Sequence, residues 1–598
     1  MSEDEEETPL EPEFSKPEDV DDGIKHGETT IVIHPGSLHL RLGRASDPLP
    51  AMLPHCIAWR SRNSSYSRVT PWIKRSETEH SESIRMVLTA AEEAQKQLGD
   101  LQSSRGKFRQ PTSTDQLADL NDEVEAEETD DVSQLVWTDL SLEKPDYIIG
   151  DDALYLSPNS GYHIIWPISY GELNIKKSRG YTVNNIMESL QVLWSSAIHK
   201  YLGVEKADLE GYNCILLIPD IFNRAHIRCM MEVVLERMGF SSVFPMQESV
   251  CAGFGMGLSS VCVVDMGDHK TSVTCVEDGI SLEPSRITLR YGGRDITRTF
   301  SWLLDHIAFP YIDCQPDDNV LDALLLQELK HSYCHMDTDG AGTEEIHFQV
   351  RPPGKKITKY SMHVGDERIV ATLAVFWPEM FGLKGSNLLL NGAYKDNDPT
   401  DVFDSDYILQ TRSKQEESAR LAAIKRKEQA VSQDDPLADD SQRDIDEDMM
   451  DTLADDMPSN KSEHGQPNAK KSGREDKIKS DQLLALDQAI LSSIEQCENE
   501  EIKRKMYSNI LLVGGGLLFE GVESLLQYRL WLHLPPHLKQ SVNITVLSRT
   551  KDIDPQSICW KGGAILSVLD IVGDQWISKE EWLKYGSKIV REKVLFAW

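Results

Sequence analysis

Two strand–turn–strand segments constrain the fold of this chain more than any other feature. Residues 29–45, TTIVIHPGSLHLRLGRA, hold a β-branched run, a Pro-Gly turn and an alternating strand. Residues 261–279, VCVVDMGDHKTSVTCVEDG, repeat this arrangement around a second glycine turn. Helical patterns follow both segments. The sequence therefore predicts an α/β protein with two related lobes that face each other, each presenting one hairpin turn to the space between them.

Several further elements follow from periodicity. A helix over 183–201 is expected to bury one apolar side, made of Ile186, Leu190, Leu193, Trp194 and Ile198. Other apolar runs predict strands over 214–219, 510–513 and 543–548. Amphipathic or helix-favouring stretches predict helices over 224–238, 320–333 and 481–506, and a helix after the turn YGGRDIT.

The acidic charge of the chain is concentrated in three short segments. The net charge is −36 over 598 residues, and residues 1–22, 121–131 and 434–456 carry −27 of it. The remaining 542 residues are nearly neutral, at −9. We therefore expect a disordered acidic tail over 1–28 and two large, mostly disordered insertions, at about 61–142 and 395–480. Helices are expected within the insertions, over 82–101 and 414–430.

Composition also excludes several classes of protein. No apolar run approaches the roughly 20 residues that a membrane span needs. The N-terminal sequence MSEDEEETPLEPE is acidic, unlike a secretory signal or an Arg-rich transit peptide. The ten cysteines are scattered without a CxxC pair, which argues against a zinc site or a disulfide framework. A reducing compartment, the cytosol or the nucleus, fits best.

The two hairpin turns have the composition of phosphate-binding loops. They read His34-Pro-Gly-Ser-Leu38 and Asp265-Met-Gly-Asp-His-Lys-Thr271. A tight glycine turn lets successive backbone N–H groups point at an anion. Asp265 and Asp268 could hold a hydrated Mg²⁺ ion through water, although Asp268 could instead cap the following turn.

A third glycine-rich segment follows the apolar strand 510–513. Gly514, Gly515 and Gly516 would allow close backbone approach to a flat ligand such as a base or ribose. A simple strand-to-helix turn would have the same sequence.

These residues together resemble the actin superfamily. The resemblance is carried, in the family's order, by Asp265-Met-Gly-Asp with Thr271, WPISYGEL, YGGRDIT, LLVGGG and the C-terminal WKGGAILSVLDIVGDQWISKEEW. It covers about 29–60, 143–394 and 481–598. It implies duplicated ribonuclease-H-like lobes around a nucleotide cleft. The first lobe would span 29–258 and the second 259–558, and 559–598 would return to the first. The turn IHPGS with RLGRA and the long insertions are most similar to nuclear actin-related subunits of the Ino-eighty class of chromatin-remodelling complexes.

The resemblance implies ATP as cofactor, with Mg²⁺, and assigns its binding residues position by position. The first phosphate loop would be Gly36, Ser37 and Leu38, with Arg41 facing the phosphates; Arg41 could also be a solvated strand residue. The second would be Asp265, Met266, Gly267 and Asp268, with Thr271 alongside. Gln247 would match the glutamine that helps place the attacking water. Gly514, Gly515 and Gly516 would lie on the adenosine side, and Lys330 less securely so, since it is interpreted as a surface helix residue.

Some positions depart from the actin pattern. His34 replaces the aspartate that orients metal-bound water in actin, and Leu38 replaces a glycine beside the γ-phosphate. His269 replaces a glycine of the second loop, and Ser272 replaces a histidine of the hydrolytic water network. Hydrolysis depends on a positioned metal and water. The departures therefore predict a protein without catalytic residues, in which ATP binds and hydrolysis is slow or absent.

The resemblance further implies a structural role in the nucleus. Expected partners are the long helicase-SANT-associated helix of a remodeller motor subunit, nuclear actin and another actin-related protein, with roles in transcription regulation, DNA repair and DNA recombination. The acidic segments could engage histones or nucleosomes. Linker DNA could meet only the short basic clusters at 60–75 and 470–479. The alternative is an actin-like ATPase that polymerises or cycles with nucleotide, which the retained Gln247, Asp265 and Asp268 would favour.

Overall fold

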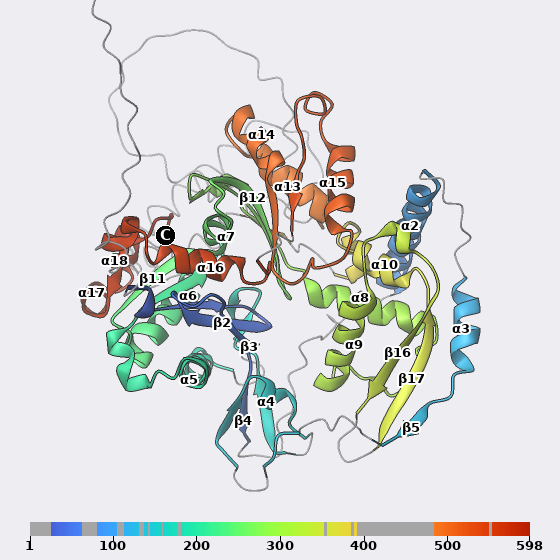
Figure 1. Cartoon of the computed structure of the whole chain (residues 1–598), viewed down its shortest axis with the longest axis horizontal. Helices are drawn as coiled ribbons and strands as arrows, with labels where there is room; N and C mark the ends of the chain where they lie inside the picture. Colours follow the sequence, from blue (N-terminus) through green and yellow to red (C-terminus); the bar gives the residue numbers. More distant parts are fainter. Residues whose placement is uncertain are drawn as a thin grey trace, which may run out of the picture. The chain divides into compact units, whose positions relative to one another are not determined.

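The computed structural model contains two main β-sheets with helices around and between them (Figure 1). It describes residues 26–61, 81–104, 113–130, 137–140, 144–157, 160–175, 181–351, 356–383, 388–390, 483–548 and 553–598. The expectations for the tail up to residue 25, the insertion 395–480, the helix 414–430 and the basic residues at 62–75 and 470–479 lie outside these ranges.

The first sheet has six strands in the order β21-β11-β10-β1-β2-β3. The predicted hairpin is confirmed: β1 and β2 are antiparallel, with His34 opposite Arg41. Strands β1, β10 and β11 are parallel, as expected for strands joined by crossover helices. The bounds are β1 Thr30–Pro35, β2 His39–Arg44, β3 Ala51–Pro54, β10 Asn213–Ile218, β11 Ser242–Gln247 and β21 Ile577–Ser578.

The second sheet repeats this arrangement. Its order is β18-β15-β13-β12-β19-β20, with β14 also paired to β13. Strands β12 and β13 form the second predicted hairpin, and β19 lies parallel to β12 as β10 does to β1. The bounds are β12 Ser260–Met266, β13 Thr271–Glu277, β14 Ile280–Ser281, β15 Ile287–Leu289, β18 Leu388–Leu390, β19 Ile510–Val513 and β20 Val546–Leu547.

Helix α5 covers the first sheet as its periodicity predicts. It spans Val183–Leu202, begins at the Thr182 N-cap and ends at Gly203, which adopts the left-handed conformation. The five apolar residues predicted to share one side of this helix are all fully buried. The same core includes α6 Arg224–Glu232 and the π-helical turn η3 Val233–Met238.

Two further helices, α7 Glu248–Met256 and α16 Ile558–Leu566, lie between the two sheets (Figure 1). Their core cluster combines residues of the first sheet, such as Val32, with residues of the second, such as Val263. Glycines allow the two helices to touch. A Cβ atom on Gly562 would lie 1.7 Å from the carbonyl oxygen of Cys251, and one on Gly255 would lie 2.3 Å from that of Ile558.

The second sheet is accompanied by helices that differ little from expectation. Helix α9, Val320–Tyr333, has the predicted bounds, and α8, Gly293–His306, follows the YGGRDIT turn. The single helix predicted over 481–506 is wrong, because the chain breaks after Glu495 and Asn499 caps a second helix. The remaining helices are α10 Glu367–Leu373, α13 Leu486–Glu495, α14 Glu500–Ser508, α15 Val522–His533, α17 Lys579–Tyr585 and α18 Lys588–Lys593.

The segment 61–142 lies in the sequence between two strands of a small sheet. This sheet consists of β4 Ile57–Arg60, β6 Tyr147–Ile149 and β7 Tyr162–Ile165. Its described part is folded into α2 Ser81–Ser104, α3 Thr114–Asp122 and β5 Glu127–Thr129. The helix predicted over 82–101 is confirmed by α2. In α2, Val87, Ala94 and Leu98 are buried on one side, which an unfolded insertion would not bury.

These elements pack on the part of the chain assigned to the second lobe, although the segment interrupts the first. Strand β5 pairs with β17 Ile357–Val364, which in turn pairs with β16 Glu344–Val350. The buried Asn121 of α3 donates to the carbonyl oxygens of Ile307 and His363. An inserted segment packs against any surface that covers its apolar side. The position of this segment in the sequence therefore did not predict its contact with the second lobe.

Candidate functional site

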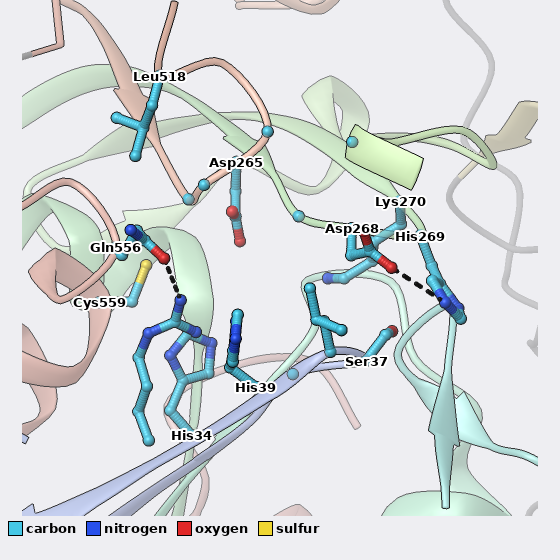
Figure 2. A pocket seen from close by; sticks show the side chains of 18 of the residues that line it. His34, Ser37, His39, Asp265, Asp268, His269, Lys270, Leu518, Gln556 and Cys559 are labelled. Carbon is cyan, nitrogen blue, oxygen red and sulfur yellow. Dashed lines mark hydrogen bonds and ion pairs between the residues drawn. The ribbon is translucent and has the colours of Figure 1, made fainter. Parts of the chain in front are cut away.

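The two hairpin turns and the glycine-rich loop line one cavity of about 300 Å³. Figure 2 shows His34 and Ser37 of the first hairpin in the same pocket as Asp265 and Lys270 of the second. The structure brings together ten of the residues assigned from the sequence, namely Gly36, Ser37, Leu38, Arg41, Asp265, Gly267, Asp268, Gly514, Gly515 and Gly516.

The first turn is closed by its own backbone. The Gly36 N–H donates to the His39 carbonyl oxygen at 3.0 Å, and the His55 ring nitrogen Nδ1 lies 2.6 Å from the Gly36 carbonyl oxygen. A Cβ atom on Gly36 would lie 2.6 Å from the His39 oxygen, so only glycine fits here. Ser37 and Leu38 form the tip of this turn and line the pocket.

The second turn is held by the start of α8. The Gly267 N–H donates to the Lys270 carbonyl oxygen at 2.9 Å, and the Gly267 carbonyl oxygen accepts from the Gly293 N–H at 2.9 Å. Gly292 passes close to the turn, since a Cβ atom there would lie 2.4 Å from the Asp268 oxygen. The YGGRDIT motif thus supports the second turn through backbone contacts.

The glycine-rich loop packs against the second hairpin as well as lining the pocket. Gly514 has a φ of +84°, and a Cβ atom on it would lie 2.4 Å from the Met266 oxygen. The Gly516 N–H donates to that same oxygen at 2.8 Å. The glycine-rich loop was predicted to allow close approach of a ligand. In the structure it also lies in close contact with the backbone of the second hairpin.

Three assigned residues do not line the pocket: Gln247, Met266 and Thr271. The Gln247 side-chain amide donates to the Asp220 carbonyl oxygen at 3.2 Å, and Thr271 Oγ1 donates to the Tyr291 oxygen at 2.9 Å. Met266 is fully buried beneath the loop. These three side chains therefore pack next to the site without lining the pocket.

The interpretation of Lys330 as a surface residue is wrong. Its side chain is buried, lines the pocket and donates to the Gly293 carbonyl oxygen at 3.0 Å. Burial lowers the pKa of Lys330, although Asp268 opposes this. Helical periodicity alone did not show that α9 lies against the cavity.

An ion network that sequence reasoning missed lies on one side of the pocket. Lys270 Nζ lies 2.5 Å from Glu248 Oε2, and His34 Nε2 lies 3.4 Å from Glu248 Oε1. Burial would raise the pKa of Glu248, but Lys270 and His34 outweigh it and lower that pKa to about 2. Burial would likewise lower the pKa of Lys270, yet Glu248 and Asp265 raise it. Both groups are therefore charged at neutral pH.

The remaining carboxylates of the pocket are less favourably placed. Burial raises the pKa of Asp268 to about 6 against the opposing effect of Arg294 and Lys330, and its Oδ2 atom is buried without a hydrogen bond among the described residues. Burial, reinforced by Glu248, also raises the pKa of Asp265. Such perturbed groups are typical of binding or catalytic sites.

These residues fit a bound Mg²⁺ ion poorly. A divalent cation needs carboxylates that are free to face it, directly or through water. Lys270 pairs with Glu248, and Asp268 Oδ2 lies 3.3 Å from the ring nitrogen Nε2 of His269, which leaves Asp265 as the one pocket carboxylate without an ion pair among the described residues. Within the described ranges, no group of three or more metal-ligating side chains is placed to hold an ion. The same ranges contain no helix long and apolar enough to cross a membrane.

Comparisons with known proteins identify the family. A family model described as Actin matches residues 25–321 and 451–595. The chain belongs to the actin family. The fold expected from the sequence, an actin-like pair of α/β lobes, is thereby confirmed.

Within the actin family, the chain is similar to actin-related protein 8, as the turn IHPGS and the long insertions indicate. It is 39% identical to actin-related protein 8 of Bos taurus and of Homo sapiens, over 95% of this chain and 92% of each relative. It is 36% identical to that of Aedes aegypti, over 96% and 98% of the two chains. A solved structure titled "Human actin-related protein Arp8 in its ATP-bound state" matches with a TM-score of 0.79 and 35% identity, over 99% of this chain and 100% of that one.

The raised pKa of Asp268 predicts how this actin-family chain responds to pH. Because the folded state holds the proton more tightly, Asp268 costs no stability below about pH 4 and costs progressively more between pH 4 and 6. The variant Asp268→Asn mimics the protonated form. We expect it to raise the free energy of unfolding by about 2–3 kcal/mol at pH 7 and to have little effect at pH 4.

Chemical denaturation of the nucleotide-free protein at the two pH values measures this difference. The exposed Asp574 supplies the control Asp574→Asn, which should change nothing at either pH. A loss of stability in Asp268→Asn at pH 7, or an equal gain at both pH values, would contradict the prediction.

Proposed function

We propose that this chain is a non-catalytic or weakly catalytic actin-related subunit of a nuclear, ATP-dependent chromatin-remodelling complex of the Ino-eighty class. The observation that carries the proposal is its identity of 39% to actin-related protein 8 over nearly the full length of both chains. The subunit would bind ATP and help the complex recruit or sense nucleosomes, histones or linker DNA. Fold alone would not choose this role, since actin-like folds serve several functions.

ATP binding is supported by the pocket and by the ATP-bound state of the similar human protein. Two glycine turns line one cavity, as they do in many sites that bind phosphate oxygens. Arg41, Lys270 and Lys330 add three basic side chains to the lining. Mg²⁺ near Asp265 and Asp268 is suggested by the second turn and by the resemblance to actin, but His269 beside Asp268 and Lys270 beside Glu248 do not favour it.

Slow or absent hydrolysis is supported by what surrounds the expected reaction centre. His34, where actin has an acidic residue, is engaged with Glu248. Gln247, expected to place the attacking water, bonds to Asp220 outside the lining of the pocket. Because catalysis of phosphoryl transfer consists largely of positioning and electrostatics, these changes should reduce turnover more than binding.

The assembly role is supported by the resemblance and by the insertions. Partners would be the long helix of the motor subunit, nuclear actin and another actin-related protein, in complexes that act in transcription regulation, DNA repair and recombination. The segment 61–142 replaces the compact loop through which actin contacts its filament neighbour. Bulk at a repeated head-to-tail contact obstructs regular stacking. The acidic segments would meet basic histone surfaces by charge complementarity.

The alternative is an actin-like ATPase that polymerises or cycles with nucleotide. Asp265 and Asp268 favour it, because both lie in the pocket as an actin-like mechanism requires. The placement of Gln247 outside the pocket lining, and the ion network at Glu248, favour the assembly subunit instead.

The rate of ATP hydrolysis distinguishes an assembly subunit from an actin-like ATPase. In a single-turnover assay with radiolabelled ATP, we expect phosphate release slower than that of actin by about tenfold or more, because Gln247 lies outside the pocket lining and His34 replaces an acidic residue of actin. Actin measured in parallel provides the reference. Phosphate release at or above the rate of actin would contradict a non-catalytic role.

Affinity purification from nuclear extract at moderate salt tests the assembly role. We expect a large Snf2-type motor subunit and monomeric actin at near-equal stoichiometry, identified by mass spectrometry and quantified by staining. Recovery of the protein alone, or as filaments that pellet with ATP, would favour the alternative.

A further inference from the structure

The charges that line the pocket balance without any added ion. Three carboxylates and three basic side chains line it: Glu248, Asp265, Asp268, Arg41, Lys270 and Lys330. Glu248, Arg41, Lys270 and Lys330 are each at most 9% exposed, and the side chain of Asp268 is 8% exposed. Water therefore screens the charges of these side chains little. In a metal-dependent nucleotide site, the carboxylates face a cation that binds together with the nucleotide. Here Lys270 already pairs with Glu248, and His269 lies 3.3 Å from Asp268.

Of the three basic side chains, Lys270 is the best placed to contact a phosphate oxygen. It lies in the second hairpin turn, between Asp268 and Thr271, and its ammonium group is 2.5 Å from Glu248 and 3.4 Å from Ser272 Oγ. Figure 2 shows Lys270 in the pocket together with Asp265 and Asp268. An ammonium group has three N–H donors, and the described residues accept two of them from Lys270, which leaves one for a phosphate oxygen.

The stem of Lys270 occupies a preformed slot. Gly171, between β8 Ile168–Ser169 and β9 Glu172–Leu173, has a φ of +77°. A Cβ atom on Gly171 would lie 3.4 Å from Lys270 Cε and 2.7 Å from Pro219 Cγ. A side chain at this position would collide with Pro219, so glycine is needed there, and the turn lies in van der Waals contact with the lysine stem.

We propose that Lys270 takes the place of a divalent cation, so that the pocket binds the triphosphate of ATP with little dependence on Mg²⁺. The inference rests on the ATP binding proposed above and extends it to the cation. An ammonium group can neutralise phosphate oxygens as a point charge. It cannot coordinate a water molecule and lower its pKa, as a metal ion does. Lys270 would thus favour binding while offering nothing to hydrolysis.

The test measures the affinity of the nucleotide-free, full-length protein for ATP by titration calorimetry, in excess Mg²⁺ and in excess EDTA. We expect the wild-type dissociation constant to change by less than about threefold between the two buffers. The variant for comparison is Lys270→Met combined with Glu248→Gln, because removing the lysine alone would leave Glu248 buried and unpaired. In EDTA this double variant should bind ATP about tenfold or more weakly than wild type, and Mg²⁺ should restore part of the loss.

Lys588→Met, at an exposed lysine of α18, is the matched control and should behave as wild type. Thermal unfolding of each variant, followed by circular dichroism, verifies that it is folded. Wild-type affinity that falls more than about tenfold in EDTA, or a double variant that keeps wild-type affinity there, would overturn the role of Lys270. Absence of ATP binding in both buffers would instead overturn the proposed ATP binding, and this inference with it.

Discussion

Two helices, α7 and α16, meet so closely that each needs a glycine where their backbones touch, and the positions of both sheets depend on this contact. A Cβ atom on Gly562 would lie 1.7 Å from the Cys251 backbone oxygen. Residues of both sheets pack around the helix pair in one core cluster. Glu248 begins α7, and Cys559 lies in α16, so both elements contribute to the pocket lining. The glycine contact thereby sets the site as well as the core.

The site that results combines rigid backbone with buried charge. Backbone hydrogen bonds close both turns and tie the glycine loop to the second hairpin. The side chains around them form ion pairs, of which Lys270 with Glu248 is the shortest in the pocket. Such pairs are costly to bury and seldom add to stability, which favours a functional reason for their presence. Preorganised cations suit a bound triphosphate, whereas turnover also needs a positioned metal and water.

Local patterns predicted much of this structure, and long-range packing explains the rest. The hairpins, α5 and α9 follow from periodicity and glycine turns, because neighbouring residues determine them. The glycine loops of the pocket were found through motifs of the actin family. Lys270 and Glu248 were missed because a lysine in a Gly-Asp turn is ordinarily solvated, and only the fold brings them together. The buried Lys330 and the packing of 61–142 likewise depend on contacts distant in sequence.

The nucleotide and metal content of the purified protein shows whether the pocket retains ATP without a metal-dependent reaction. The protein would be purified in buffer with Mg²⁺, desalted and denatured, and the released nucleotide identified by chromatography and the magnesium by mass spectrometry. We expect ATP, with magnesium well below one ion per nucleotide. ADP as the main nucleotide, or magnesium equal to the nucleotide, would contradict it.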